Sequence, residues 1–223
     1  MSGPLVKICG VKDAATAIDA ARAGADFLGF VFFRKSPRFV TPEAAEEIIL
    51  DLKQAAFDEG FAMPRLVGLF VDAGEKELSE AAPLLTHFQF HGHESPERCS
   101  ELGLEFGVEV IKAIPVTGKG DVSDASDYEE AADIILFDAK PPPGAGQPGG
   151  NGVSFDWTLL SAYEGETPYI VAGGLTPENV GEAVKGQKSR EAFLGVDVSS
   201  GVESAPGKKD DALVKAFISA SKG

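Results

Sequence analysis

Leu5-Val6-Lys7-Ile8-Cys9-Gly10, close to the amino terminus, is the stretch on which the interpretation of the whole sequence depends. It predicts a short apolar strand that ends at a thiol and is followed at once by a glycine. Side chains of a strand alternate between its two faces, so Lys7 and Cys9 share one face with Leu5. Cys9 is either a small hydrophobic residue of the core or a thiol placed for chemistry. The polar residues that end several later strands favour the second interpretation.

Eight strands of this kind alternate with helix signals along the 223 residues. The predicted strands are 5–9, 26–33, 65–71, 87–91, 108–114, 134–138, 169–172 and 193–197. A short helix is predicted over 126–131 and another from 155 onward. Alternating strands and helices predict a parallel sheet with right-handed crossovers, and eight units predict an α/β fold, a single (β/α)8 TIM barrel over residues 1–223. The alternative, an open doubly wound sheet, more often has about five or six units and a glycine fingerprint after its first strand, which Gly10-Val11-Lys12 is not.

The composition is strongly acidic, with 35 Asp and Glu against 20 Lys and Arg and a formal net charge of −15. A field of this sign disfavours nucleic acid and anionic membranes as partners, and an anionic substrate would need a locally positive pocket. We find no apolar run of membrane-spanning length and no signal-peptide pattern in residues 1–4, so we expect a cytoplasmic protein. The two cysteines, Cys9 and Cys99, do not indicate a disulfide framework.

The carboxyl ends of all eight strands are expected to meet at one rim, where barrel enzymes build their active sites. Chemically useful residues follow several strands: Cys9, Arg38, His91, Asp138, Gly173, Gly174 and the stretch 197–201. Glycine-rich turns present backbone amides to anions, and this fold often binds phosphate in its last two strand–helix loops. We therefore predict a phosphate site at Gly173 and Gly174 together with Ser199, Ser200 and Gly201, although such glycines can also serve only the turns.

Nine motifs run in order from the first strand to the last helix. They are Lys7-Ile8-Cys9-Gly10, Gly29-Phe30-Val31-Phe32, Ser36-Pro37-Arg38, Gln89-Phe90-His91-Gly92, Asp138-Ala139-Lys140, Pro148-Gly149-Gly150-Asn151-Gly152, Phe155-Asp156-Trp157, Ala172-Gly173-Gly174-Leu175 and Val196-Asp197-Val198-Ser199-Ser200-Gly201-Val202-Glu203. In type and spacing they resemble the phosphoribosylanthranilate isomerases of tryptophan biosynthesis. The resemblance implies a cofactor-free Amadori rearrangement of N-(5-phosphoribosyl)anthranilate to an aminodeoxyribulose phosphate. One departure is Phe90, where the family more often has leucine.

The resemblance also implies roles for individual residues. Asp138 would be the general acid for the ribose ring oxygen and Cys9 the general base for the proton on C2, each worth about 10²–10⁴-fold in rate. Arg38 would bind the anthranilate carboxylate, because a guanidinium can donate two parallel hydrogen bonds to it. Lys7 is either a positive neighbour that favours the Cys9 thiolate or the partner of a structural carboxylate such as Asp197.

His91 either contacts the substrate or forms a hydrogen bond inside the barrel, and the loop 141–151 is expected to be a lid or a wall of the site. The predicted substrate-binding residues are Lys7, Arg38, His91, Gly150, Gly173, Gly174, Asp197, Ser199, Ser200 and Gly201. The resemblance implies that no cofactor is needed, and we expect no metal, because the three histidines cluster around one strand. The expected partner is a small-molecule phosphoribosyl substrate, and the protein is expected to be a monomer or a homodimer.

Three rival functions differ from this interpretation in testable ways. The related histidine-pathway isomerase would be expected to have an aspartate in place of Cys9. A metal-dependent pentose epimerase would need several histidine and carboxylate ligands that point inward. A catalytically inactive phosphate-binding barrel would keep the glycine-rich loops but lose Cys9 or Asp138, and the sequence has both residues.

Overall fold

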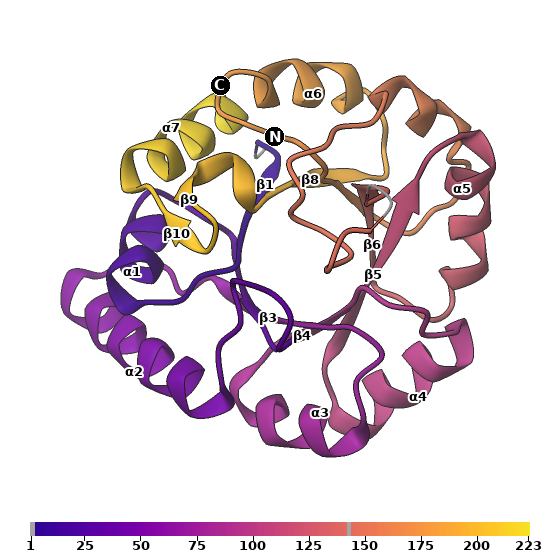
Figure 1. The fold of residues 1–223 in the computed structure, drawn as a ribbon. Helices are drawn as coiled ribbons and strands as arrows, with labels where there is room; N and C mark the ends of the chain where they lie inside the picture. The colour runs from indigo at the N-terminus through magenta and orange to yellow at the C-terminus, as the bar shows by residue number, and fades with distance from the viewer. Residues whose placement is uncertain (1–2, 142–143) are drawn as a thin grey trace.

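The computed structural model describes residues 3–141 and 144–223. Eight parallel strands form a closed barrel in chain order, and the last strand pairs with the first (Figure 1). The strands are β1 Leu5–Cys9, β2 Phe27–Val31, β3 Arg65–Phe70, β4 His87–Phe90, β5 Glu109–Val116, β6 Ile134–Ala139, β7 Tyr169–Val171 and β8 Phe193–Val198. The predicted (β/α)8 barrel is confirmed, and the open doubly wound sheet is excluded.

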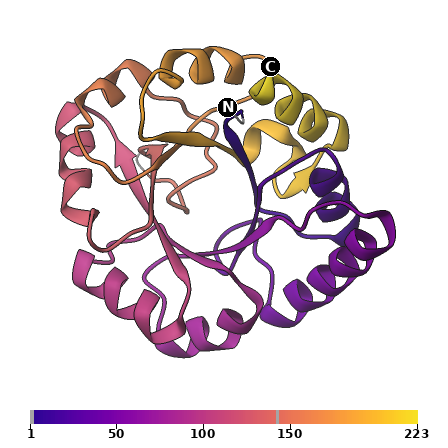
Figure 2. The ribbon, with the colours of Figure 1, turned by 180° about the vertical axis from the view of Figure 1, so that it is seen from behind.

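Helices surround the barrel on its outer side, as both ribbon views show (Figures 1 and 2). They are α1 Ala14–Arg22, α2 Pro42–Glu59, α3 Glu75–Ala81, α4 Pro96–Phe106, α5 Lys119–Ser123, α6 Val180–Gln187 and α7 Asp211–Lys222. Asp13, Thr41, Ser95 and Asp210 begin four of them by accepting hydrogen bonds from first-turn N–H groups. In the described part of the chain, no helix combines the length and the apolar character needed to cross a membrane.

Two helix predictions were wrong in detail. The helix expected over 126–131 is replaced by α5 and a 3₁₀ helix, η2 Asp124–Tyr128, which lie earlier in the chain. The helix expected from 155 onward is only a 3₁₀ helix, η3 Trp157–Ala162. Serine and aspartate bond readily to nearby backbone groups, so both short segments form tight turns in place of a regular α-helix.

The alternation along the strands divides the core into two regions. Val6 and Ile8 pack in the apolar layer between the barrel and the helices, whereas Cys9 lies inside the barrel with Val31 and Leu69. A second apolar cluster fills the barrel below them, formed by Phe27, Val67, Ile111, Ala113, Ile134, Leu136, Ile170 and Ala172. Phe90 is buried in the outer layer, so its difference from the family leucine lies away from the barrel mouth.

The loop between β6 and β7 passes across the barrel mouth in the view of Figure 1. Residues 142–143 of the predicted lid lie outside the described residues. After β8, a 3₁₀ helix, η4 Ser200–Val202, leads into a small hairpin of β9 Glu203–Ala205 and β10 Lys208–Lys209. The sequence did not predict this hairpin, and it contributes two charged side chains to the site.

A buried ion pair fastens the loop that follows β4. Nζ of Lys112 lies 3.0 Å from Oε2 of Glu94 and 2.9 Å from the carbonyl oxygen of Gly92. Glu94 also accepts hydrogen bonds from the backbone N–H groups of Asp72 and Gly92. The side chains of Lys112 and Glu94 are 3% and 6% exposed, so neither charge has water as a substitute partner.

Lys112→Met is therefore expected to lower the free energy of unfolding by about 3–5 kcal/mol, because it leaves the Glu94 carboxylate buried without a cation. The matched control is Lys215→Met, which breaks an exposed pair with Asp19 and should cost no more than about 1 kcal/mol. Urea denaturation followed by circular dichroism measures both. Equal losses in the two variants would contradict the structural role given to Lys112.

Candidate active site

Two adjoining cavities open at the carboxyl ends of the barrel strands. The first has an empty volume of about 430 Å³ and is lined by residues that include Cys9, Arg38, His91 and Asp138. The second, of about 390 Å³, is lined by the residues that follow β7 and β8 and by residues 150–153 of the long loop. Four residues line both cavities, namely Asp138, Gly150, Asp197 and Ser199. One elongated molecule can therefore extend from one cavity into the other.

All the predicted site residues except Lys7 line one or both of these cavities, and Lys7 lies directly behind two of them. Those that line a cavity are Cys9, Arg38, His91, Asp138, Gly150, Gly173, Gly174, Asp197, Ser199, Ser200 and Gly201. Nζ of Lys7 lies 2.7 Å from Oδ1 of Asp197, which is its register partner across β1 and β8. Lys7 is therefore paired with Asp197, as one of its two interpretations predicted, and this pairing does not exclude the other. Burial lowers the pKa of Lys7, but Asp197 and then Cys9 raise it by more, so Lys7 keeps its proton.

Cys9 ends β1 and is 4% exposed. Gly29 of β2 lies beside it in register, and a Cβ atom there would approach Sγ of Cys9 to 3.0 Å. Burial raises the pKa of the Cys9 thiol, and the Lys7 ammonium offsets only part of that effect. Lys7 thus acts in the direction suggested by the sequence, but the resting side chain at neutral pH is a thiol and not a thiolate.

Asp138 lies at the end of β6 and faces both cavities. Its Oδ1 accepts a hydrogen bond of 2.8 Å from the backbone N–H of Ala139, and its Oδ2 lies 3.5 Å from Nε2 of His91. Burial, followed by the negative charge of Asp197, raises the pKa of Asp138 to about 7. A carboxyl group with this pKa holds its proton long enough near neutral pH to act as a general acid.

Gln89 of β4 and His91, the residue that directly follows this strand, both line the first cavity. Nε2 of Gln89 lies 3.5 Å from Nδ1 of His91, and burial, helped by Lys7 and Lys112, lowers the pKa of His91 to about 3. His91 is therefore neutral, and it lies both at the cavity wall and beside Asp138. Gln89 was not among the predicted site residues, yet its buried Oε1 has no hydrogen-bond partner in the described chain. Its alternation with His91 in the sequence was the available signal.

The guanidinium group of Arg38 is not free, although its predicted role would use two of its nitrogens to bind a substrate carboxylate. Its Nε and Nη2 donate hydrogen bonds of 2.8 Å to the two carboxylate oxygens of Glu203, and Nη2 also lies 3.3 Å from the carbonyl oxygen of Gly150. The parallel pair of bonds that the sequence suggested for a ligand is thus formed with Glu203. Nη1 is the guanidinium nitrogen that bonds to no described residue, and it has room because Gly150 carries no side chain.

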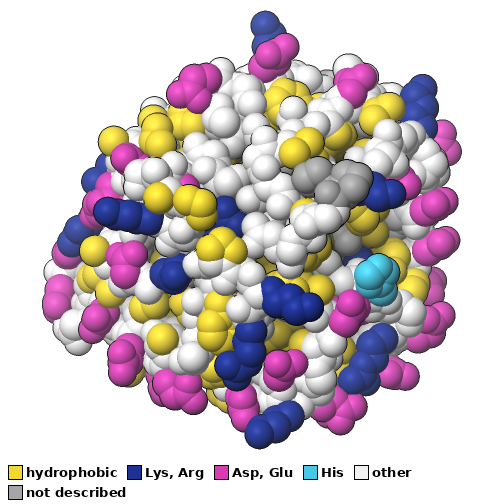
Figure 3. All heavy atoms as spheres, viewed as in Figure 1, with side chains coloured by type: hydrophobic (Ala, Val, Ile, Leu, Met, Phe, Trp, Pro, Cys, Tyr) yellow, Lys and Arg dark blue, Asp and Glu magenta, His cyan; other side chains and the backbone are white. Residues whose placement is uncertain are grey.

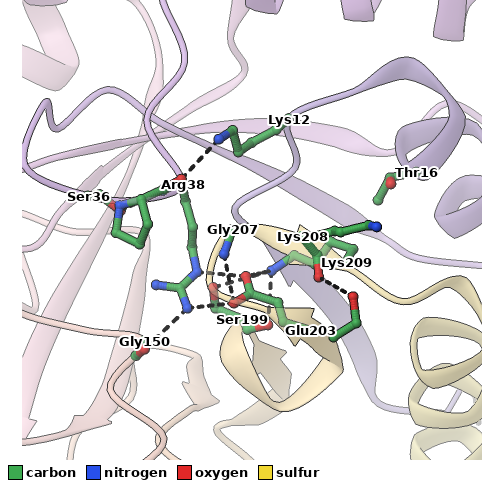
Figure 4. A network of polar contacts seen from close by, with 12 residues as sticks. Lys12, Thr16, Ser36, Arg38, Gly150, Ser199, Glu203, Gly207, Lys208 and Lys209 are labelled. Carbon is green, nitrogen blue, oxygen red and sulfur yellow. Dashed lines mark hydrogen bonds and ion pairs between the residues drawn. The ribbon is translucent and has the colours of Figure 1, made fainter.

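Glu203 and Lys209 were also missed as site residues. Nζ of Lys209 lies 2.8 Å from Oε1 of Glu203 and 2.9 Å from the carbonyl oxygen of Ser199 (Figure 4). Burial raises the pKa of Glu203, but Arg38 and Lys209 lower it by more, so Glu203 stays ionised. The available signal was the last motif, which ends at Glu203, and the lysine that shortly follows it.

Two cations and one carboxylate therefore lie at the barrel mouth of a chain whose net charge is −15. Arg38 and Lys209 exceed Glu203 by one positive charge, while Lys7 and Asp197 neutralise each other. On the outer surface of the same face, several Lys and Arg side chains lie near the centre and others at the edge, whereas most Asp and Glu side chains lie around the edge (Figure 3). This arrangement provides the locally positive pocket that an anionic substrate requires.

The glycine-rich turns after β7 and β8 line the second cavity. The backbone N–H groups of Gly173, Gly174, Ser200 and Gly201 donate no hydrogen bond within the described residues. Gly173 and Gly174 have positive φ angles of 79° and 63°, and a Cβ atom on Gly201 would collide with the carbonyl oxygen of Leu175. These turns therefore require glycine, and their unpaired amides can bind an anion such as phosphate.

The histidines that cluster in the sequence separate in the structure. His87 is the first residue of β4, and its Nε2 lies 2.6 Å from Oε2 of Glu109. His93 is exposed at the surface. In residues 3–141 and 144–223, no group of three or more His, Cys, Asp and Glu side chains is arranged to hold a metal ion.

Residues 6–220 match the family model described as N-(5'phosphoribosyl)anthranilate (PRA) isomerase. The chain belongs to this family. The N-(5'-phosphoribosyl)anthranilate isomerase of Rhodospirillum rubrum is 47% identical over 222 residues, which cover 99% of this chain and 98% of the relative. That of Paramagnetospirillum magneticum is 46% identical over 220 residues, which cover 98% of this chain and 97% of the relative. The resemblance drawn from the nine motifs is thus confirmed.

Solved phosphoribosylanthranilate isomerases share the fold over the whole chain. The crystal structure of the Thermotoga maritima enzyme superposes with a TM-score of 0.81 at 35% identity and covers 100% of both chains. A phosphoribosyl anthranilate isomerase in complex with reduced 1-(o-carboxyphenylamino)-1-deoxyribulose 5-phosphate superposes with a TM-score of 0.79 at 33% identity, again over 100% of both chains. The Thermotoga maritima enzyme has also been solved as monomers generated from a dimeric form, with a TM-score of 0.79 at 33% identity over 100% of both chains.

Proposed function

We propose that this chain catalyses the Amadori rearrangement of N-(5-phospho-β-D-ribosyl)anthranilate to 1-(2-carboxyphenylamino)-1-deoxy-D-ribulose 5-phosphate, a step of L-tryptophan biosynthesis. Family membership supports the reaction. The observation that carries the proposal is the placement of a protonated carboxyl, Asp138, and a thiol, Cys9, in one cavity that continues into an anion site. The reaction needs an acid, a base and two anion-binding ends, and the site offers all four.

Asp138 acts as the general acid in this proposal. It gives its proton to the ribose ring oxygen as the bond between C1 and that oxygen breaks, which leaves an iminium ion between C1 and the anthranilate nitrogen. Its pKa of about 7 keeps the proton available near neutral pH. The N–H of Ala139, 2.8 Å from Oδ1, is placed to stabilise the carboxylate that forms.

Cys9 acts as the general base. It removes the proton from C2 of the iminium ion, and the electron pair of the broken C–H bond forms an enolamine. The enolamine then takes up a proton at C1 and loses the proton of its C2 hydroxyl group, which gives the ketone. Asp138 has given one proton and Cys9 has taken one, so the overall reaction gains and loses no atoms. The base is the thiolate form of Cys9. The positive charge on the iminium nitrogen makes the C2 proton acidic, which lowers the basicity that this thiolate must supply.

The two cavities hold the two ends of the substrate in this proposal. The phosphate binds to the unpaired amides of Gly173, Gly174, Ser200 and Gly201 in the second cavity. The anthranilate ring packs against the apolar wall of the first cavity, formed by Val31, Phe33 and Leu69. Its carboxylate binds to Nη1 of Arg38, the guanidinium nitrogen that Glu203 leaves unused.

Arg38→Lys is expected to raise KM by about tenfold or more with a smaller effect on kcat, because the lysine keeps the positive charge but loses the planar guanidinium. The matched control is Arg34→Lys in the same loop, whose side chain lies over the Phe39 ring, 5.3 Å from its centroid. Steady-state kinetics on both variants measures the difference. An unchanged KM in Arg38→Lys would contradict the assignment of Arg38 to the anthranilate carboxylate.

The experiment that tests the function is the loss of anthranilate-type fluorescence when the purified protein meets freshly generated phosphoribosylanthranilate. Rapid turnover supports the isomerase. No turnover, with inorganic phosphate still bound, would instead support the catalytically inactive phosphate-binding barrel. A cytoplasmic location and a monomeric or homodimeric state stay predictions from the sequence.

A further inference from the structure

We propose that Glu203 is a positioning residue that holds both anion-binding ends of the site in place at once. Through Arg38 it orients the carboxylate-binding end, and through Lys209 it orients the phosphate-binding turn after β8. The inference rests on the proposed function for the identity of the two anions. It assigns to the hairpin of β9 and β10 a role in substrate affinity at two places that lie in different cavities.

Both carboxylate oxygens of Glu203 already accept two hydrogen bonds each from the protein, so Glu203 does not bind a substrate directly. Oε1 accepts from Nε of Arg38 and Nζ of Lys209, both at 2.8 Å, and Oε2 accepts from Nη2 of Arg38 at 2.8 Å and the backbone N–H of Gly207 at 3.1 Å. Two bonds to each oxygen satisfy a carboxylate. Since its side chain is 4% exposed, Glu203 acts through its neighbours and not on the reacting atoms.

On the carboxylate side, Glu203 fixes the rotation of the Arg38 guanidinium. The two parallel bonds from Nε and Nη2 define the plane of the group. Nη1 is thereby directed away from Glu203, as Figure 4 shows. The hairpin also packs against the loop that carries Arg38, because a Cβ atom on Gly207 would collide with the carbonyl oxygen of Pro37.

On the phosphate side, the connection passes through one peptide group. Nζ of Lys209 donates a hydrogen bond of 2.9 Å to the carbonyl oxygen of Ser199. In a trans peptide the next N–H points opposite to that carbonyl, so the N–H of Ser200 is directed away from Lys209. This N–H is one of the unpaired donors that line the second cavity. Glu203 holds Lys209 in place and therefore fixes the direction of a phosphate donor.

The strand register of the hairpin places Glu203 directly opposite Lys209. Glu203 and Lys209 are cross-strand partners in β9 and β10, and the register shifts between Lys208 and Lys209. The shift turns the buried Lys209 toward Ser199, while the neighbouring Lys208 stays exposed at the surface. Two consecutive lysines thus differ in environment, which provides a matched pair for mutagenesis.

The variant Glu203→Gln distinguishes a positioning role of Glu203 from a simple effect of its negative charge on anion binding. Removing a negative charge between two cations would by itself strengthen the binding of anions to the site. Loss of positioning has the opposite effect, because the NH₂ group of a glutamine would replace one carboxylate oxygen. In one orientation it faces Nη2 of Arg38 and the N–H of Gly207, and in the other it faces Nε of Arg38 and Nζ of Lys209, and none of these donors can bond to it. We expect the dissociation constants of anthranilate and of inorganic phosphate each to rise about tenfold.

The experiment measures direct binding to the whole protein, with anthranilate followed by its fluorescence and inorganic phosphate by ³¹P line broadening. Lys209→Met should weaken phosphate about tenfold and anthranilate less, and Arg38→Lys should weaken anthranilate alone. Lys208→Met, the control, should change neither. Melting temperatures are recorded for every variant, since a purely structural role would lower them without changing either dissociation constant.

Unchanged or tighter binding of both anions by Glu203→Gln would overturn the inference. If that variant does not fold, Lys209→Met decides, because phosphate binding equal to that of Lys208→Met would overturn it as well. Binding does not depend on turnover. A wild-type protein that fails to isomerise the substrate but shows the expected pattern of binding would refute the proposed function and leave the positioning role of Glu203 intact.

Discussion

Asp138→Asn is expected to lower kcat by about 10³-fold, within the range of about 10²–10⁴ that general acid catalysis provides. Asparagine has nearly the same shape as aspartic acid, and its Oδ1 can still accept the hydrogen bond from the N–H of Ala139. It lacks an acidic proton, so the ribose ring must open without protonation of its oxygen. The measurement is single-turnover fluorescence loss, which separates the chemical step from product release.

The pH dependence of kcat/KM gives a second test of Asp138. The reactive form needs a protonated Asp138, with a pKa of about 7, and an ionised Cys9, whose pKa burial raises. Below about pH 7 the rate should rise with pH, because the thiolate fraction grows while Asp138 stays protonated. Between the pKa of Asp138 and the higher pKa of Cys9, kcat/KM should stay level with pH, because the gain in thiolate and the loss of protonated Asp138 cancel. In Asp138→Asn this level region should be replaced by a continued rise.

The stability of Asp138→Asn provides the folding control. The pKa of Asp138 is 3.8 as its ordinary value and about 7 in the folded protein. Between these values the folded state binds the proton and the unfolded state does not, so this residue's contribution to stability falls as pH rises through the window. Each unit of difference in pKa between the folded and unfolded states corresponds to about 1.4 kcal/mol in the free energy of unfolding. At about pH 8 the asparagine variant, which has no charge to bury, should be more stable than the wild type.

These two results together would assign the loss of activity to chemistry. A variant that is inactive and also less stable at alkaline pH would contradict the assignment, because it would point to a carboxylate that the fold requires. Asp156→Asn is the matched control for the substitution itself, since Asp156 is an exposed carboxylate that begins η3 and lines neither cavity. Its kcat should stay within about twofold of the wild type.

Alternation along single strands is what made much of the site predictable from the sequence. Period two placed Lys7 and Cys9 on one face of the first strand, and the structure turns that face toward the inside of the barrel. The closure of eight strands then brought residues from Cys9 to Gly201 to one rim, because all parallel strands end on the same side. These inferences needed only local pattern and chain order.

Contacts between distant segments could not be predicted in the same way. Arg38 and Glu203 are 165 positions apart, and no local pattern says that a fork of hydrogen bonds will join them. Lys209 follows a register shift in a two-residue strand, which the sequence does not reveal. The family resemblance therefore predicted that Arg38 binds an anion, but no pattern in the sequence predicted the carboxylate of Glu203, which occupies one edge of its guanidinium.

Cys9→Ser should lower kcat by about 10²–10⁴-fold, because a hydroxyl group ionises far less readily than a thiol and cannot remove the C2 proton. The two side chains differ by one atom, and the neighbouring Gly29 leaves space for either. The matched control is Cys99→Ala, because Cys99 is a buried core residue of α4, away from both cavities. Cys99→Ala should turn over at nearly the wild-type rate, apart from the loss of stability expected of a truncated core side chain.

The ionisation of Cys9 can be measured without turnover in the Cys99→Ala background, where Cys9 is the one remaining thiol of the sequence. Alkylation by iodoacetamide at a series of pH values reports the thiolate fraction. We expect a pKa above that of an ordinary cysteine, and a further rise in Lys7→Met, because Lys7 is the largest influence that opposes burial. A thiolate already formed at neutral pH would contradict this account. It would mean that Cys9 is already a base in the free enzyme. The structure instead indicates that Cys9 is ionised in only a small fraction of molecules, and that this thiolate removes a C2 proton made acidic by the iminium ion.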